Sequence, residues 1–143
     1  MCEFIKEIKD KTQFTGYKVA CKRRGKYYSP ATGIEYKPGK IKIPLCTGKN
    51  KLCDTFREVL CESTGCYKEH YKGLTAVFVN LCDAKTRQAY WRRSMKSGYE
   101  MVILKMTIQK TKDKNCYVGD YQSALVYIGS RIRSFKEIDK KFE

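Results

Sequence analysis

A short basic segment carries the residues whose types and spacing most directly suggest a chemistry. Residues 22–42 read KRRGKYYSPATGIEYKPGKIK and contain seven Lys or Arg, three Tyr and one acid. Cationic side chains neutralise phosphate groups, and tyrosine rings offer flat surfaces on which nucleobases stack. The segment therefore predicts a surface for a phosphate-bearing ligand. The side chains expected to form it are Lys22, Arg23, Arg24, Lys26, Tyr27, Tyr28, Lys37, Lys40 and Lys42.

The same pattern has a simpler structural interpretation. In a half-exposed strand the side chains alternate between two faces, so that lysines take the solvent positions and tyrosines pack at the edges. Residues 40–43 (KIKI) alternate in this way and need no ligand. The cluster 22–26 beside Tyr27 and Tyr28 is not explained by alternation, which favours a functional surface there. No zinc-finger spacing, RNA-binding-sheet motif or helix-turn-helix pattern accompanies it.

The charge of the whole chain supports an anionic partner. Thirty Lys and Arg against fifteen Asp and Glu give the 143 residues a formal net charge of +15. Such a field attracts phosphates, anionic lipids or acidic proteins without selecting among them. Arg87, Arg92 and Arg93 lie in a predicted helix and would extend the basic surface. We expect a nucleic acid or nucleotide as partner, with an acidic protein as the alternative.

Four potential zinc ligands lie within eighteen residues: Cys53, Cys61, Cys66 and His70. Structural zinc sites do use three Cys and one His. The ligands of such sites usually come as pairs two to four residues apart, whereas seven, four and three residues separate these side chains. The spacing favours buried or incidental thiols, and we predict no metal and no cofactor.

No catalytic constellation is evident in the sequence. The chain has no phosphate loop, nucleophile elbow or paired-histidine motif, and its single histidine limits Cys–His chemistry to His70 with a distant cysteine. These observations favour a binding protein over an enzyme.

The pattern of apolar residues predicts one α+β domain over residues 1–143, with a mixed or antiparallel sheet packed against one main helix and one or two shorter helices. The main helix is expected over about residues 83–97, capped by Asn80 and ended by Gly98. Shorter helices are expected at the N-terminus, where Phe4, Ile5 and Ile8 share a face, and over residues 53–62. The short charged tail from Ser134 is a further helix candidate. Strands are expected at residues 17–21, 26–28, 40–43, 74–79, 101–108 and 124–128, with a tight turn at Arg24-Gly25.

The sequence predicts a cytoplasmic protein, in a bacterial or host cell. No apolar run approaches the roughly 18 residues that a membrane-spanning helix needs, and the start MCEFIKEIKDK lacks the apolar core of a secretory signal. We therefore expect no membrane partner. In a reducing compartment the eight cysteines are expected to be mostly free thiols. The sequence does not predict an oligomeric state.

The order of four segments resembles that of small uncharacterised domains from phages and bacteria, which sometimes occur beside pentapeptide repeats. The segments are YKVACKRRGKYYSP, GIEYKPGKIKIP, GLTAVFVNLCDA and EMVILKMTI. They match a Tyr-Lys strand, a Tyr-x-x-Gly-Lys segment, a Gly-led strand before an Asp-Ala helix start, and a final apolar strand. The resemblance implies an accessory protein of a phage, virus or mobile element.

The order of a Gly-led strand, an Asp-Ala helix and an apolar strand also resembles ADP-ribosyltransferase-like folds. Members of that superfamily hold a nicotinamide dinucleotide with an Arg or His on an early strand and a late Glu. The early strand here offers Lys18, Lys22 and, at its end, Arg23, and the late acid is Glu137. The family's complete triad is not present.

The leading hypothesis is thus a small, basic, intracellular binding protein that engages a nucleic acid or nucleotide, in a role that suits an inhibitor of host defence. Two alternatives stay open. One is an ADP-ribosyltransferase-like or other nucleotide-processing enzyme, and the other is an interaction module for an acidic protein.

Overall fold

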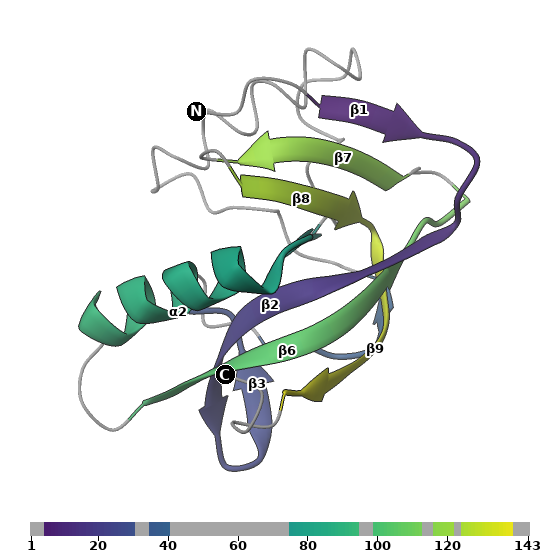
Figure 1. Cartoon of the computed structure of the whole chain (residues 1–143). Helices are drawn as coiled ribbons and strands as arrows, with labels where there is room; N and C mark the ends of the chain where they lie inside the picture. The colour runs from purple at the N-terminus through teal and green to yellow at the C-terminus, as the bar shows by residue number, and fades with distance from the viewer. Residues whose placement is uncertain are drawn as a thin grey trace.

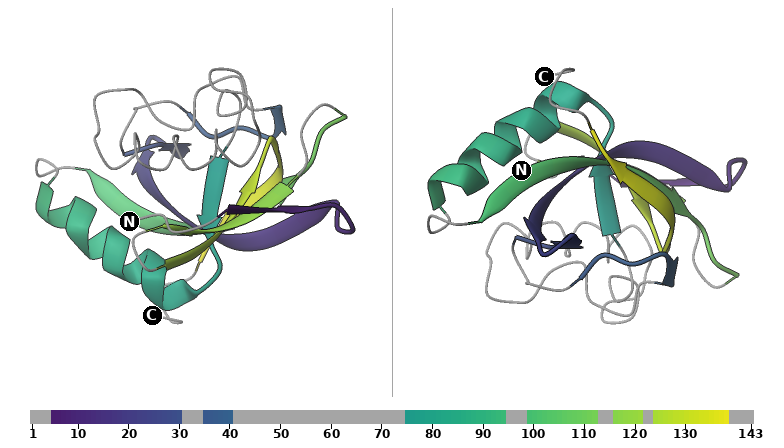
Figure 2. Two further views of the ribbon diagram at one scale, coloured as in Figure 1. Left: turned by 90° about the horizontal axis from the view of Figure 1, so that it is seen from above. Right: turned by 90° about the horizontal axis from the view of Figure 1, so that it is seen from below.

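The computed structural model describes residues 5–30, 35–40, 75–94, 99–112, 116–121 and 124–138. These residues form a mainly β structure in which one helix, α2 (Leu81–Ser94), lies on one face of a curved sheet (Figures 1 and 2). The strands are β1 (Ile5–Ile8), β2 (Gln13–Arg23), β3 (Lys26–Tyr28), β4 (Gly39–Lys40), β5 (Thr75–Phe78), β6 (Glu100–Gln109), β7 (Cys116–Tyr121), β8 (Ala124–Gly129) and β9 (Arg131–Glu137).

All strand pairs of this sheet are antiparallel. The strand order is β1-β7-β8-β5-β2-β6-β9-β4, and β3 pairs with the end of β2 as a hairpin. β1 and β2 follow each other in the chain but are separated by three strands in the sheet. The sheet is twisted, so that β7 and β8 are inclined to the direction of β2 and β6 (Figure 1).

The longest pairing joins β2 and β6. It runs without interruption from Gln13 opposite Gln109 to Lys22 opposite Glu100. Residues 101–104 of β6 are buried on both faces, which explains their continuous apolar sequence. Because this ladder lies in the middle of the sheet, its alternation decides which face each neighbouring side chain occupies.

One face of the sheet, here called the core face, carries the main hydrophobic core. Phe14 and Ala20 of β2 join the even-numbered residues of β6, from Val102 to Ile108, in one buried cluster. Phe14 also packs against Tyr127 of β8, with ring centroids 4.5 Å apart. Val77, Cys116 and Ile132 complete the buried cluster.

The opposite face, here called the helix face, packs against α2. The backbone carbonyl of Asn80 accepts bonds from the Asp83 and Ala84 amides at 3.2 and 3.4 Å, which begins the helix. Ala84 and Gln88 are its buried residues, and the half-buried Trp91 packs on Val19, Cys21 and Met101. No helix in the described ranges has the length and apolar character needed to span a membrane.

Gln88 adds a polar contact to this helix–sheet interface. Its buried Nε2 donates to the Met101 carbonyl at 2.9 Å. β9 pairs with β6 only from Leu104 onward, so the carbonyl of Met101 is satisfied by the helix and not by that neighbouring strand. The interface thus fixes the position of α2 along the sheet with a hydrogen bond as well as with apolar contacts.

The predicted fold class was wrong. The described residues form mostly sheet, with nine strands and one helix, so the chain is not an α+β domain built on one main helix with shorter ones. The predicted N-terminal helix is instead strand β1, where Ile8 lies opposite Cys116. The predicted helical tail is strand β9 through Glu137.

Several local predictions were confirmed. The main helix begins near the predicted capping residue Asn80, and residues 75–78 form an interior strand of the sheet. Strands also occur at the positions predicted around residues 17–21, 26–28, 101–108 and 124–128. The predicted helix over residues 53–62, residues 41–43 of a predicted strand and the proposed stop at Gly98 lie outside the described residues.

Gly16 marks a close approach of two strands. A Cβ atom there would lie 2.5 Å from the Phe78 carbonyl oxygen and 2.6 Å from Val77 Cγ2. We predict that Gly16→Ala lowers the free energy of unfolding by about 1–3 kcal/mol, because overpacking outweighs the usual gain from replacing a strand glycine. Urea unfolding measures this change.

Lys105→Ala, at an exposed position of β6, is the control and should change the stability by less than about 0.5 kcal/mol. Equal stability of Gly16→Ala and the wild type would contradict the close approach of β2 and β5.

Candidate nucleic-acid interface

The predicted tight turn joins β2 to β3. Arg24 and Gly25 have φ values of 52° and 77°. Positive φ at both central residues of a two-residue hairpin is the geometry of a type I′ turn, which matches the twist of paired strands. Arg23 and Lys26 face each other across this turn, and all four residues from Arg23 to Lys26 are exposed. The hairpin thereby places three cationic side chains at one tip of the molecule.

Arg23 contacts two tyrosine rings. Its guanidinium carbon lies 5.4 Å from the Tyr28 ring centroid and 5.6 Å from that of Tyr99. Nη1 of Arg23 also donates a long hydrogen bond of 3.4 Å to the Tyr99 hydroxyl. Tyr99 is 39% exposed. An exposed guanidinium beside exposed aromatic surface is suited to contacting phosphates and bases together.

Strand alternation separates Lys22 and Tyr27 from this group. Both lie on the core face, where Lys22 Nζ is 2.9 Å from Glu137 Oε1 and the Tyr27 hydroxyl donates to the same oxygen at 3.0 Å. The Tyr27 ring also packs edge-on against Phe135, with centroids 5.7 Å apart. Lys22, Tyr27 and Glu137 thus form a polar cluster at the margin of the core, here called the Glu137 cluster.

The Glu137 cluster shifts two pKa values upward. The hydrogen bond and the charge of Glu137 raise the pKa of Lys22. Burial, followed by the hydrogen bond to Glu137, raises the pKa of Tyr27. The cluster therefore favours the protonated forms of both residues. It also brings together Lys22 and Glu137, the early cation and late acid singled out by the ADP-ribosyltransferase-like resemblance.

A second lysine lies on the core face. Lys18 Nζ donates to the Ala76 carbonyl at 2.7 Å and lies 5.7 Å from the Tyr36 ring centroid. Tyr36 packs against the core cluster, and burial raises its pKa to about 12, against the opposing effect of a hydrogen bond with Ser29. Tyr36, which belongs to the quoted basic segment, is therefore a residue that packs against the hydrophobic core.

The remaining cations of the basic segment do not join the hairpin. Lys37 lies 3.8 Å from Glu35, and Lys40 of β4 pairs with Arg131 of β9. Arg131 in turn lies opposite Gln109, at the other end of β6 from the hairpin. The nine residue steps of β6 from Glu100 to Gln109 correspond to about 30 Å, so Lys40 lies far from the hairpin. Lys42 lies outside the described residues.

The predicted helix arginines occupy the solvent side of α2. Arg92 and Arg93 are exposed in its last turn, where cations suit the helix dipole, and Arg87 is half-buried. Trp91 packs on Cys21 and Met101 near the end of β2, so the last turn of α2 lies at the same end of the sheet as the hairpin (Figure 1).

The cysteines in the described ranges behave as core residues or lie on the surface. Cys21 and Cys116 are buried free thiols, and burial raises the pKa of both, to about 11 for Cys116. Cys82 is exposed. The four potential zinc ligands of the sequence, Cys53, Cys61, Cys66 and His70, lie outside the described residues. Within the described part of the chain, no group of three or more His, Cys, Asp or Glu could hold a metal ion.

Comparisons with known proteins bring no relative to this arrangement. No protein-family model matches the chain, and neither a curated protein nor a solved structure does. The resemblances stated from the sequence therefore stay predictions.

Tyr99 is the candidate binding residue that the sequence analysis missed. It lies outside the quoted segment, at the residue before β6. The signal that identifies it is register: Lys22 lies opposite Glu100, so Tyr99 follows next to Arg23. The pairing of the two strands would have been needed to find it.

The Glu137 cluster predicts a pH-dependent contribution to stability. In the folded protein the pKa values of Lys22 and Tyr27 are raised above their ordinary values of 10.5 and 10.0. The stability that these two groups contribute is therefore complete at a pH below the ordinary pKa values, and it is lost as the pH rises through the folded pKa values. We expect Glu137→Gln to lower the urea midpoint near neutral pH. The difference from the wild type should shrink above about pH 10.

Glu35→Gln is the matched control. Its partner Lys37 is 71% exposed, so the lost ion pair should have almost no effect at any pH. A constant difference between Glu137→Gln and the wild type across this pH range would contradict the assignment.

Proposed function

We propose that the protein binds single-stranded nucleic acid through the hairpin surface, defined as Arg23, Arg24, Lys26, Tyr28 and Tyr99. The observation that carries the proposal is the contact of the Arg23 guanidinium with the Tyr28 and Tyr99 rings. The guanidinium supplies a cation for a phosphate, and the rings supply stacking surface for adjacent bases. Arg24 and Lys26 add exposed cations on both sides of the turn.

The aromatic component favours single strands over a duplex. Stacking on a tyrosine requires an unpaired base, whereas a duplex presents mainly its phosphates to a surface of this kind. The net charge of +15 adds long-range attraction that would speed association with any polyanion. The hairpin tip would then provide the short-range contacts.

A reducing, cytoplasmic location is part of the proposal. It is supported by the use of Cys21 and Cys116 as buried thiols, where they behave as small apolar side chains.

Charge reversal tests the hairpin surface. We predict that Arg23→Glu with Arg24→Glu weakens binding of a fluorescein-labelled oligonucleotide, measured by fluorescence anisotropy across a salt series. Loss of two phosphate contacts should reduce the slope of log K against log salt by about 1.4, at roughly 0.7 per single-strand phosphate. Thermal unfolding should change little, because exposed turn residues contribute little stability.

The matched control is Lys6→Glu with Lys9→Glu. These residues are exposed in and beside β1, at the opposite end of the molecule from the hairpin, and give the same change in net charge (Figure 1). Equal losses of affinity in the two double variants would show binding by net charge alone. Unchanged binding with a lower melting temperature in the hairpin variant would also overturn the proposal.

A further inference from the structure

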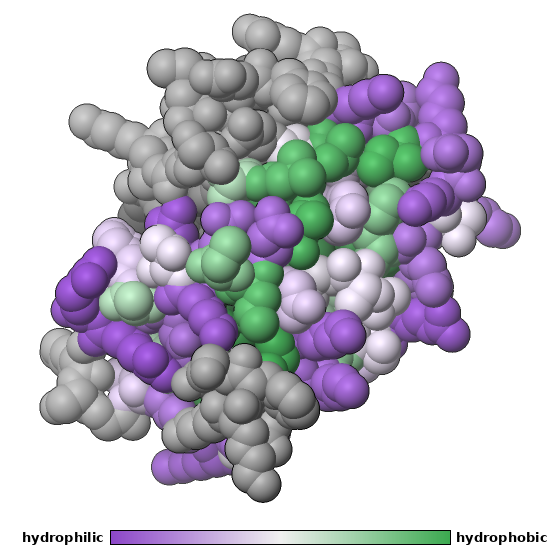
Figure 3. Space-filling view, viewed as in Figure 1, coloured by the Kyte–Doolittle hydropathy of each residue, from purple (hydrophilic) through white to green (hydrophobic). Residues whose placement is uncertain are grey.

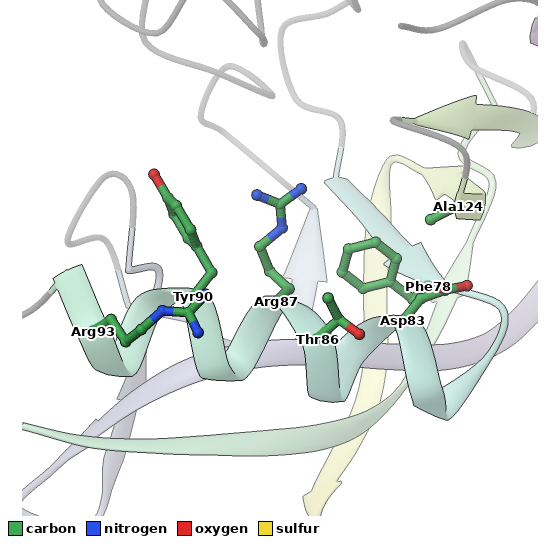
Figure 4. A pocket seen from close by; sticks show the side chains of 7 residues that line it. All are labelled: Phe78, Asp83, Thr86, Arg87, Tyr90, Arg93 and Ala124. Atoms are coloured by element: carbon green, nitrogen blue, oxygen red, sulfur yellow. The ribbon is translucent and has the colours of Figure 1, made fainter.

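A cleft of about 290 Å³ lies between α2 and the ends of β5 and β8 (Figure 4). It is distinct from the hairpin surface and shares no residue with it. This volume lies just below the range of roughly 300–1,000 Å³ that is typical of small-molecule sites. It suits a ligand of the size of one nucleotide. The lining residues are Phe78, Asp83, Thr86, Arg87, Tyr90, Arg93 and Ala124.

The helix supplies most of these side chains because their spacing places them on one side of it. Asp83, Arg87 and Tyr90 follow at intervals of four and three residues, which brings them into one stripe. Arg87 and Tyr90 point from the helix in a similar direction, and the Phe78 ring lies beside Arg87 (Figure 4). The stripe therefore carries an acid, a cation and an aromatic ring in that order along the helix.

The basic end contains a contact between an arginine and a tyrosine of the cleft. The Arg87 guanidinium carbon lies 5.5 Å from the Tyr90 ring centroid. Tyr90, 45% exposed, packs edge-on against Trp91 with centroids 5.3 Å apart, and Trp91 is anchored on Met101. Arg93 adds a second, exposed cation one turn beyond. Two guanidinium groups near one cleft are suited to a phosphate group, which they can bind bidentately.

The other end offers a flat apolar wall and an acceptor. Phe78 comes from the end of β5, where the strand leads into the helix, and Ala124 from the start of β8. A planar ring can pack on Phe78. The Asp83 carboxylate only accepts hydrogen bonds, so it favours a base whose amino group lies beside a ring N–H, as in guanine, over uracil, whose single N3–H donor lies between two carbonyl oxygens.

We propose that this cleft binds a nucleoside monophosphate whose base carries an amino group, with its phosphate between Arg87 and Arg93 and its base on Phe78 near Asp83. The distribution of surface character agrees with this assignment. In Figure 3 the α2 side of the molecule is mostly hydrophilic, with hydrophobic side chains gathered over β7 and β8. The cleft lies where these two regions meet, as a ligand with a charged end and an aromatic end requires.

Trp91 makes the proposal directly testable, because it is the single tryptophan of the chain and contacts Tyr90. Titration with GMP should change its emission, with NMR chemical shifts of the α2 amides as a second readout. Guanosine and inorganic phosphate, titrated separately, should each bind more weakly than GMP. UMP should also bind more weakly, and Asp83→Asn should reduce the difference between GMP and UMP. If phosphate alone binds as tightly as GMP, or if GMP does not bind, the proposal is wrong.

Two neighbouring arginines provide a matched pair of variants. Arg93 lines the cleft and Arg92 does not, although both are exposed in the last turn of α2. Arg93→Gln should weaken GMP binding by about fivefold or more, and Arg92→Gln should leave it within about twofold. Equal losses in the two variants would indicate a diffuse charge effect and overturn the proposal.

The hairpin variant separates this site from the proposed function. Arg23→Glu with Arg24→Glu should retain GMP binding in the cleft while losing oligonucleotide affinity. If the wild type binds oligonucleotides but not GMP, the cleft assignment fails and the hairpin assignment stands. If it binds GMP but not oligonucleotides, the reverse holds.

Discussion

The ladder between β2 and β6 is the constraint on which the rest of the structure depends. Its ten pairs, from Gln13–Gln109 to Lys22–Glu100, place alternate residues of both strands on opposite faces. One set builds the core that includes Ala20 and Leu104, and the other set supports α2. A shift of one residue in this register would exchange the two faces of β2 and move Phe14 and Ala20 out of the main core. The same register sends Arg23 to the aromatic group with Tyr99 and Lys22 to Glu137.

The helix is therefore held by a small part of its surface. The contact with the sheet is made by Ala84, Gln88 and Trp91. The Gln88 amide donates a hydrogen bond to the Met101 carbonyl, which fixes the position of the helix along the sheet. A helix anchored in this way can devote its remaining surface to polar and aromatic side chains, because little of its stability depends on them. This explains how arginines and an exposed Tyr90 occur together along α2 without cost to the fold.

Local features could be predicted from the sequence, but the architecture could not. The Arg24-Gly25 turn, the Asn80 cap and the apolar run in β6 carry short-range signals. Strand β9 was not predicted, because its sequence does not alternate regularly. Its pairing with β6 shifts register between Thr107 and Ile108, which leaves Arg133 as an extra residue. Ile132 and Phe135 consequently both reach the core at a spacing of three residues, which is also a helical spacing. The four residues of β1 are too few for periodicity to separate strand from helix. The candidate site was predicted in part for the same reason: its hairpin is local, whereas Tyr99 reaches Arg23 only through strand pairing across 76 residues of sequence.

The distribution of acids decides which cations are available for a ligand. In the described part of the chain, Lys22 and Lys37 have carboxylate partners, Glu137 and Glu35, and both partners are half-buried. At these two lysines an incoming phosphate would have to displace an existing carboxylate contact. Arg23 instead contacts two tyrosine rings, which hold the guanidinium in place without neutralising it. The net charge of the chain thus overstates the functional surface, and the hairpin arginine positioned by two aromatic rings keeps its charge for a partner.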